Sequence, residues 1–426
     1  MLTRNQLIIL GIVAFLIVFF ILGLLGVIPI FKSPTEQQSG NIQAQITFWG
    51  VNSASNFKNV FEAYSTNHPN VIVKYQQFDE SAYENSLLNA WATGKGPDVF
   101  MFHRSWLPKH GDKILAASDT QFSLYNLRQL FPDAIEKDFV SNQKIMALPL
   151  YLDTLALFYN KDIFNSKGIA LTPSTWDDFK NLIPTLNEFD FSHNIKKAAA
   201  AIGGSNKSVS KASDLLSLLM LQTNPTFSDY TNRKNNFGAK TLEAFNFYLQ
   251  FADPSQPSYT WSENFGNSIN GFASGDVAMM FNYSREIKEL KQKNPYLNFG
   301  ITPMPQFNQS SPINYADYWG LAVSKQSKNS QTAWSFIISL TTNQQLADSF
   351  SKDSNSPPAL RTLINQYLND TGMGVFAKQA LTAKSVYQSD KDIFSQSISN
   401  MIESVLTGKM DSVKALQQAA SEINGR

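Results

Sequence analysis

The 426-residue sequence has no cysteine, only four histidines and few charged residues. Without cysteine it can form no disulfide, offers no thiol nucleophile and cannot carry a lipid on an N-terminal cysteine. No HExxH motif accompanies the histidines, which argues against a catalytic zinc site. Charged residues make up 16% of the chain and the formal net charge is +1. We therefore expect no basic surface that would bind nucleic acid.

The common catalytic signatures are also missing. The chain has no GxSxG motif, and Gly94-Lys95-Gly96 lacks both the third glycine of GxGxxG and the GxxxxGK[ST] spacing. A glycoside hydrolase needs two carboxylates that face each other across the sugar. The candidates by position alone are Asp98, Asp153, Glu263 and Asp276. Nothing in their spacing pairs them, so we expect no catalytic residue, no cofactor and no metal.

One long apolar run stands at the N-terminus. Residues 7–31 contain no charged side chain, with Arg4 before them and Lys32 after them. As a helix this run would rise about 37 Å, enough to cross a hydrocarbon core of about 30 Å. No small-x-small cleavage site follows it. We expect residues 1–32 to be a single-pass membrane anchor, residues 33–44 to be a polar linker, and the body to lie outside the cytoplasm.

The rest of the chain alternates between strand and helix patterns. Strands at residues 46–49, 71–73 and 98–102 enclose helices at residues 57–64 and 83–91, an order that favours a parallel sheet with helices on its faces. Further strands are expected near residues 147–148, 155–159, 277–281, 299–302 and 318–324. A capped helix should begin near residue 173, and helices should dominate residues 210–252 and the chain from residue 329 onward. The predicted fold class is α/β.

Aromatic and hydrogen-bonding side chains follow three of the predicted strands, at residues 49–52, 102–106 and 282–285. In open α/β sheets, ligands bind outside the carboxyl ends of the strands. The aromatic content of 13% suits both well-filled cores and a cleft lined with rings. These three segments therefore indicate a small-molecule site.

Five segments resemble the family 1 extracellular solute-binding proteins, the maltose-binding-protein-like components of ABC transporters. They lie in the family's order at residues 91–100, 148–161, 175–179, 272–280 and 333–337. The resemblance implies a periplasmic-binding-protein-like type II fold, in which two lobes joined by a hinge close on a ligand in the cleft. It implies a monomer without enzymatic activity that captures a small ligand, usually a sugar or oligosaccharide, for an ABC permease.

The resemblance also implies a division of the body into lobes. Residues 45–151 would form the first part of the first lobe, and residues 152–315 the first part of the second. Residues 316–357 would return to the first lobe, and residues 358–426 would add C-terminal helices to the second.

The matching segments and the three strand ends, with Ser205 as a further cleft candidate, give the expected ligand-binding residues. They are Trp49, Asn52, Phe102, His103, Arg104, Ser105, Trp106, Asp153, Ser205, Asn282, Tyr283, Arg285, Tyr318 and Trp319. Ser105 replaces an acidic residue of the family and Arg285 replaces a stacking ring, which argues against maltodextrin as the ligand. Arg285 suits an acidic or amide-bearing ligand instead.

Other readings stay open at this point. Each aromatic side chain in the set can equally well pack in a core. A membrane-anchored sensor would bind a ligand without transport, and the sequence does not separate it from a transport component. A glycoside hydrolase would use Asp153 with another acid of the cleft.

Overall fold

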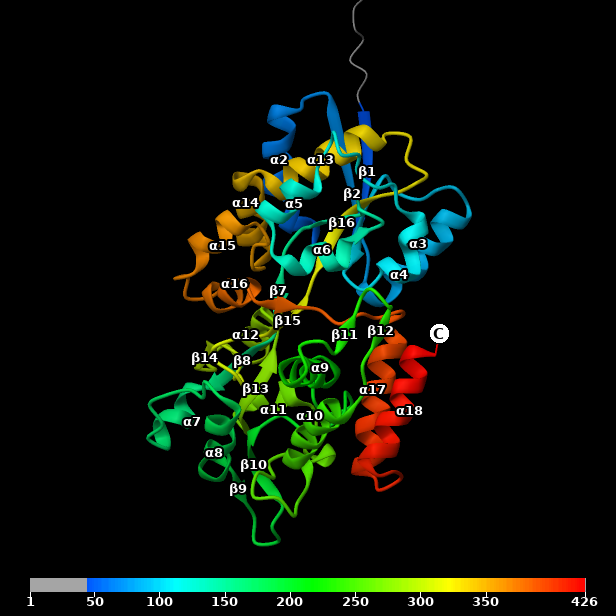
Figure 1. Cartoon of the computed structure of the whole chain (residues 1–426). Coiled ribbons are helices and arrows are strands. Elements are labelled where there is room, and N and C mark those ends of the chain that lie inside the picture. Colours follow the sequence, from blue (N-terminus) through cyan, green and yellow to red (C-terminus); the bar gives the residue numbers. More distant parts are fainter. Residues whose placement is uncertain (1–43, 426) are drawn as a thin grey trace, which may run out of the picture.

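The computed structural model describes residues 44–425, which form two lobes, one above the other in Figure 1. The sheet of the first lobe has the strand order β2-β1-β3-β16-β6. Strands β1, β2 and β3 are parallel, whereas β16 and β6 run antiparallel to their neighbours. Their bounds are β1 Ala44–Gly50, β2 Val71–Gln77, β3 Val99–His103, β6 Leu148–Pro149 and β16 Trp319–Val323. The expected order of the first three strands and the two helices between them is confirmed, but the sheet is mixed.

Amphipathic helices cover this sheet. In α2, the predicted apolar face buries Val60 and Tyr64, and Phe57 is buried in the turn before it. At the end of β1, a Cβ on Gly50 would lie 2.7 Å from Met101 Sδ and 2.8 Å from the Tyr75 hydroxyl, so both side chains would have to shift to admit one. The helices and short strands of this lobe are η2 Ala54–Phe57, α2 Lys58–Asn67, α3 Glu80–Ala92, α4 Leu107–His110, η3 Gly111–Lys113, α5 Leu124–Leu130, α6 Asp133–Phe139, β4 Val140–Ser141, β5 Lys144–Ile145, α13 Ser330–Thr342, α14 Gln344–Ser354 and α15 Arg361–Tyr367.

The sheet of the second lobe has the order β14-β8-β13-β10-β9, in which only β10 and β13 are parallel. Its strands are β8 Ala156–Asn160, β9 Glu188–Phe189, β10 Ile195–Ala200, β13 Val277–Asn282 and β14 Phe299–Thr302. The helices are α7 Lys161–Ser166, α8 Trp176–Leu186, α9 Ala212–Thr223, α10 Ala239–Leu249, η4 Gln250–Ala252, η5 Glu263–Phe265, α11 Ser268–Ser274, α12 Glu286–Lys293, α17 Lys391–Leu406 and α18 Ser412–Asn424.

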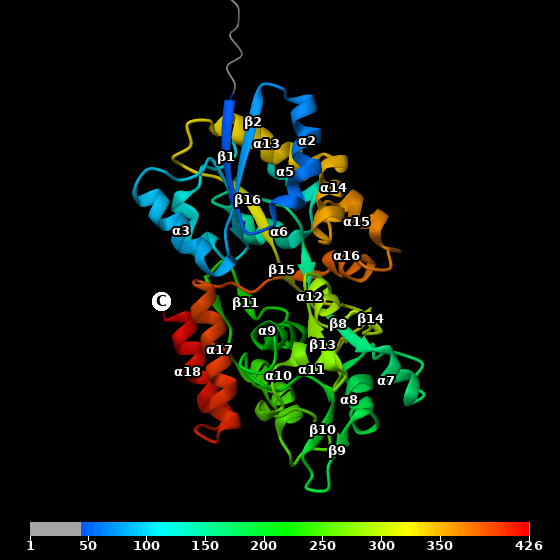
Figure 2. The same ribbon diagram turned by 180° about the vertical axis from the view of Figure 1, so that it is seen from behind.

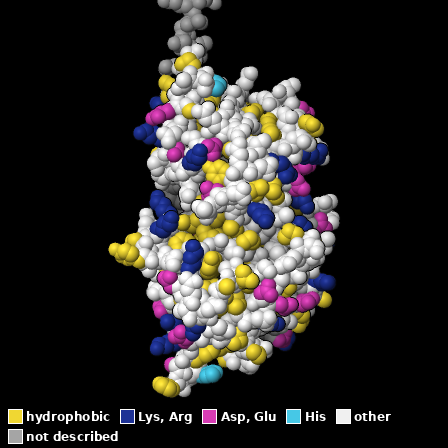
Figure 3. Space-filling model, turned by 90° about the vertical axis from the view of Figure 1, so that its left-hand side faces the viewer, with side chains coloured by type: hydrophobic (Ala, Val, Ile, Leu, Met, Phe, Trp, Pro, Cys, Tyr) yellow, Lys and Arg dark blue, Asp and Glu magenta, His cyan; other side chains and the backbone are white. Residues whose placement is uncertain are grey.

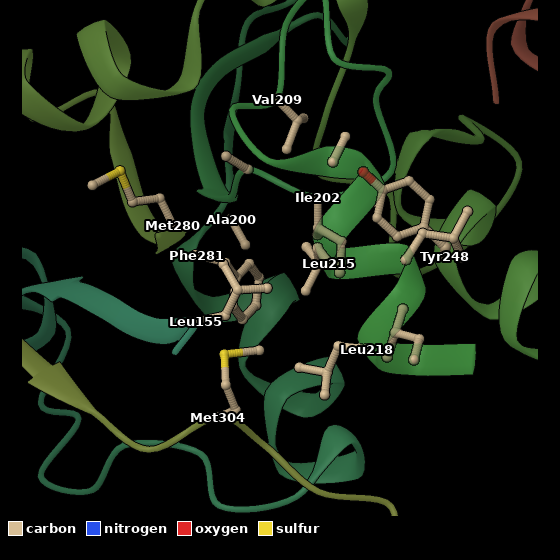
Figure 4. Packing of buried hydrophobic residues seen from close by; sticks show 14 of the residues in the cluster. Leu155, Ala200, Ile202, Val209, Leu215, Leu218, Tyr248, Met280, Phe281 and Met304 are labelled. Atoms are coloured by element: carbon tan, nitrogen blue, oxygen red, sulfur yellow. The ribbon is translucent and has the colours of Figure 1, made fainter. Parts of the chain in front are cut away.

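Two features show why the second lobe folds this way. The predicted helix start is confirmed, because Thr175 and Asp178 cap α8 with reciprocal side-chain hydrogen bonds to each other's backbone N–H. Helix α9 is apolar on nearly all sides and forms the centre of the core. Figure 4 shows Leu215 and Leu218 of α9 in the same buried cluster as Phe281 of β13.

A small three-stranded sheet lies where the chain passes between the lobes (Figure 1). Its strands are β7 Asp153–Thr154, β15 Asn314–Asp317 and β17 Ala383–Lys384, in the order β17-β15-β7. Neighbouring residues on these strands belong to different cores: Tyr315 packs in the second lobe and Ala316 in the first. These short strands are therefore the hinge region.

The C-terminal part of the chain differs from the expected division. Leu363 and Ile364 of α15 pack in the core of the first lobe, whereas α17 and α18 pack in the second. Helix α16 (Gly374–Ala380) contributes to both cores. Residues 358–426 are thus shared between the lobes, because an apolar helix face predicts burial without saying which core buries it.

Several elements were not predicted. A hairpin of β11 (Ser228–Asp229) and β12 (Lys234–Asn235) interrupts the region expected to be helical at residues 210–252. The sequence pattern also misses β10, β15 and β17. The predicted membrane anchor at residues 1–32 and most of the linker lie outside the described residues. Between residues 44 and 425, no helix combines the length and apolarity needed to span a membrane.

Candidate functional site

The carboxylate of Asp317, on hinge strand β15, is the centre of a buried polar cluster between the lobes. Its Oδ1 atom accepts a hydrogen bond from His103 Nε2 of the first lobe at 2.9 Å. Its Oδ2 atom accepts one from Arg285 of the second lobe at 2.9 Å. Arg104 Nε lies 3.5 Å from Oδ1. One carboxylate therefore joins three of the predicted site residues from two lobes.

His103 ends β3 and Ser105 follows it closely. The ring atom Nδ1 of His103 lies 2.7 Å from the Ser105 hydroxyl, and both residues are buried. Asp317 is an acceptor, so the Nε2 atom of His103 carries the proton and Nδ1 accepts from Ser105. Burial and the charge of Lys391 lower the pKa of His103 to about 4, although Asp317 opposes this shift. The imidazole is therefore neutral at pH 7.

Asp153, on hinge strand β7, is held entirely by internal donors. Its carboxylate accepts hydrogen bonds from the backbone N–H and the hydroxyl of Ser284 and from the backbone N–H of Thr154. Burial raises its pKa to about 6, against the opposing effect of Arg285 and of these hydrogen bonds. Asp153 thus fixes the end of β13 against the hinge.

Arg285 lies over the ring of Tyr283, with its guanidinium carbon 4.4 Å from the ring centroid. The Tyr283 hydroxyl donates to Asp214 at 2.8 Å. The sequence suggested that Arg285 could bind an acidic ligand. In the structure its carboxylate partner is Asp317.

An aromatic cluster adjoins the polar one on the first lobe. The rings of Trp106 and Trp319 meet edge to face with centroids 5.1 Å apart, and Trp106 stacks on Tyr83 at 5.9 Å. Trp106 and Trp319 are buried, whereas Trp49 is partly exposed and packs on Phe78. Trp49 is thus the most exposed tryptophan of this set.

Two predicted site residues belong to the core of the first lobe. Phe102 is fully buried against Phe100 and Phe139, and Tyr318 packs on Phe139 and donates to Asp138 at 2.7 Å. Their contact with a ligand stays a prediction, although side chains alternate across a strand. His103 reaches the polar cluster, so its neighbour Phe102 points the other way.

The remaining three predicted residues are Ser205, Asn282 and Asn52. Ser205 is buried and its backbone N–H donates to Glu263. The side chain of Asn282 accepts from the backbone N–H of Tyr283. Asn52, after β1, has a buried Oδ1 atom without a hydrogen-bond partner among the described residues.

A cavity of about 300 Å³ lies between the lobes, beside Arg104 and Ser105. Its walls also include residues 107–108 and 137–142 of the first lobe, part of the β11–β12 hairpin, and residues 386–388. Its volume is at the lower end of the range for small-molecule pockets, about 300–1,000 Å³. Of the fourteen predicted residues, only Arg104 and Ser105 line it.

The structure adds contacts across the cleft that sequence patterns do not reveal. Lys109 of α4 lies 2.8 Å from Asp390, which caps α17 of the second lobe, and 2.8 Å from Glu84 of α3. Lys391 lies 3.5 Å from Glu80. Figure 2 shows the upper end of α17 reaching towards α3. The partners are about 300 residues apart along the chain, so no local signal pairs them.

A second cavity, of about 500 Å³, lies outside the cleft between the second lobe and α16. Three prolines, Met304 and Leu381 contribute to its walls. It is on the side of the molecule shown in Figure 3, where hydrophobic side chains gather at mid-height. Among residues 44–425, no group of three histidine or acidic side chains is placed to hold a metal ion.

Comparison with known proteins assigns the chain to a family. The model of the family described as "Bacterial extracellular solute-binding protein" matches residues 50–347. The chain belongs to this family. The resemblance seen in the five sequence segments is therefore confirmed.

Two relatives are named for the sugars they bind. The maltotriose-binding protein of Pyrococcus abyssi (strain GE5 / Orsay) is 23% identical over 72% of this chain and 64% of its own length. The galactooligosaccharide-binding protein of Bacillus subtilis (strain 168) is 25% identical over 93% of this chain and 92% of its own.

Solved structures with the same fold include the sugar-binding protein MalE from Xanthomonas citri. It is 20% identical, with a TM-score of 0.74 over 89% of this chain and 96% of its own. The cyclic alpha-maltosyl-1,6-maltose binding protein from Arthrobacter globiformis is 17% identical, with a TM-score of 0.76 over 90% of this chain and 98% of its own length. The predicted two-lobed solute-binding fold is thus confirmed.

Proposed function

We propose that this solute-binding protein captures a sugar or oligosaccharide outside the cytoplasm and delivers it, chemically unchanged, to the permease of an ABC transporter. The observation that carries the proposal is the interlobe cleft, where rings and hydrogen-bonding side chains of both lobes meet. The names of the relatives support the ligand class. The internal donors that surround Asp153 argue against its use as a catalytic acid.

The cleft chemistry suits sugars. A sugar ring has apolar C–H faces that pack on aromatic rings, and hydroxyl groups that bind amides, carboxylates and guanidinium groups. The first lobe would contribute Trp49, Asn52 and the segment from His103 to Trp106. The second lobe would contribute Tyr283 and Arg285.

Capture would proceed by closure of the lobes about the short strands β7, β15 and β17. The contacts of Lys109 with Asp390 and of Lys391 with Glu80 form only when α17 approaches the first lobe. They would help to hold the closed form around the ligand.

We also propose that residues 7–31 anchor the protein as a single-pass segment and that it acts as a monomer. The body begins at β1, at the end of the first lobe farthest from the second (Figure 1). The linker would thus join the body at that end. A sensor without transport would use the same anchor and cleft.

Isothermal titration of the full chain in mild detergent against a panel of neutral and acidic saccharides tests the ligand class. We expect at least one saccharide to bind. Arg285→Gln should weaken that binding, whereas Arg128→Gln, in an exposed ion pair with Glu136, should not. Binding of a peptide or polyamine and of no saccharide would overturn the proposal. So would turnover of a glycoside that stops in Asp153→Asn.

A further inference from the structure

The cavity between the lobes has more positive than negative side chains in its walls. Its cations are Arg104, Lys137 and Arg233, and its one carboxylate is that of Asp138. Arg104 already lies 3.5 Å from the carboxylate of Asp317, so the positive excess of the walls comes from Lys137 and Arg233. The two lobes share these groups, because Arg233 belongs to the β11–β12 hairpin of the second lobe.

The carboxylate of Asp138 is already occupied. Its Oδ1 atom accepts from the hydroxyls of Tyr230 at 2.6 Å and Ser385 at 2.7 Å, and its Oδ2 atom accepts from Tyr318 at 2.7 Å. Among residues 44–425, neither Lys137 nor Arg233 makes an ion pair. The cations at the mouth of the cavity are therefore not neutralised by contact with a carboxylate of the described chain.

Arg104 and Gln388 bring buried polar atoms to the same cavity. Arg104 is 3% exposed and donates to the hydroxyl of Tyr315 at 2.7 Å and to the carbonyl of Val386 at 3.3 Å. A guanidinium has five N–H donors, and the Nε of Arg104 has no hydrogen-bond partner among the described residues. Gln388 is 4% exposed and its Oε1 atom also has none. The Arg104 Nε atom faces Asp317 Oδ1 at 3.5 Å as an ion pair. A buried polar atom without a partner is costly, so the Oε1 atom of Gln388 favours a polar ligand.

Two rings complete the wall. Tyr230 and Tyr387 both line the cavity and meet edge to face, with centroids 5.8 Å apart. Aromatic surface of this kind packs against the C–H face of a sugar ring. The cavity thus combines a surface for a sugar ring with an excess of donors for an anion.

We propose that this cavity binds a sugar unit that carries a carboxylate, as in a uronic acid, an inference that rests on the proposed saccharide function. The carboxylate would accept hydrogen bonds from Arg104 and be attracted by Lys137 and Arg233, while the ring packs on Tyr230 and Tyr387. Arg285, whose carboxylate partner is Asp317, would contact uncharged hydroxyl groups.

The test compares uronate disaccharides with their neutral counterparts on the full chain. Digalacturonate, diglucuronate and dimannuronate would each be titrated beside the matching neutral disaccharide. We expect one uronate to bind at least about tenfold more tightly than its neutral partner. Raising the salt concentration from 50 to 500 mM should weaken uronate binding and leave neutral binding unchanged, since salt screens charges at the mouth of the cavity.

A double variant separates the cavity from the rest of the cleft. Lys137→Gln with Arg233→Gln should weaken uronate binding about tenfold and leave neutral binding and the melting temperature unchanged. Lys74 and Lys414 are exposed cations outside the cavity, so Lys74→Gln with Lys414→Gln is the matched control. It should change neither the binding of uronates nor that of neutral disaccharides.

Three results would overturn the inference. Neutral disaccharides that bind as tightly as uronates would remove the carboxylate site and leave the saccharide function standing. So would a double variant that weakens the binding of both equally. Tighter binding of sulfated disaccharides than of uronates would replace the carboxylate with another anion. If no saccharide of any kind binds, the proposed function itself fails.

Discussion

Two buried groups at the hinge should give the folded protein opposing responses to acid. The pKa of His103 is lowered from 6.5 to about 4, mainly by burial and by the charge of Lys391. The pKa of Asp153 is raised from 3.8 to about 6, mainly by burial. Each value differs by more than two units from that of the unfolded chain, so each group links folding to pH.

Whether each group stabilises or destabilises the fold as pH falls depends on whether the folded or the unfolded state binds its proton more tightly. Folding disfavours protonated His103, so its contribution to stability is complete above pH 6.5 and is lost as pH falls towards 4. Folding favours protonated Asp153, so its penalty is complete above pH 6 and is relieved as pH falls to 3.8. At 1.36 kcal/mol per pKa unit, each effect amounts to about 3 kcal/mol. In the parent protein the two largely cancel between pH 4 and 6.5.

Variants that remove one of the two groups should therefore show a pH dependence of stability that cancels in the parent protein. The free energy of unfolding would be measured by denaturant titration at pH 4, 5, 6 and 7. Relative to the parent, His103→Gln should gain about 3 kcal/mol as pH falls from 6.5 to 4, and Asp153→Asn should lose about as much. His193→Gln, at an exposed histidine, is the control and should follow the parent. If both test variants keep the parent's pH profile, the reasoning is refuted.

Further predictions concern the cleft and the anchor. Asp317→Asn leaves the buried guanidinium of Arg104 and the partly exposed guanidinium of Arg285 without their carboxylate, and should lower the free energy of unfolding by about 3 kcal/mol in a denaturant titration. Lys109→Gln removes the contact with Asp390 across the cleft. Because the Lys109 side chain is 36% exposed, this should cost about 1 kcal/mol or less, seen as an up to about fivefold weaker saccharide affinity by calorimetry. Deleting residues 1–32 should move the protein from the membrane fraction to the soluble fraction after cell lysis, with unchanged saccharide affinity. Continued sedimentation with membranes would contradict the proposed anchor.

Local patterns predicted the long elements well. The apolar face of α2 and the buried run of β3 each arise from residues that are close together in the sequence. The spacing of apolar residues in those short stretches therefore predicts them directly. The hinge strands β15 and β17 escaped prediction. They are only four and two residues long, and β15 pairs with β7 from about 160 residues away. Pairing between strands that are so short and so far apart in the chain leaves no periodic pattern in the surrounding sequence.

The candidate site could be predicted only in part. His103 and Arg104 were predicted because they follow a strand pattern, and Asp153 because its segment resembles a family motif. Asp317 was missed although it directly precedes Tyr318, since its role depends on cations from both lobes. Phe102 packs in the core of the first lobe. All five residues of β3 are buried, so position on the strand alone does not separate a core face from a cleft face.

A crystal structure of the full chain with its bound saccharide would test the central claim most directly. We predict that the sugar lies between the lobes. It should contact the segment from His103 to Trp106 on the first lobe, and on the second lobe Arg285 or the β11–β12 hairpin. A saccharide held by one lobe alone, or outside the cleft in the cavity beside α16, would contradict the account.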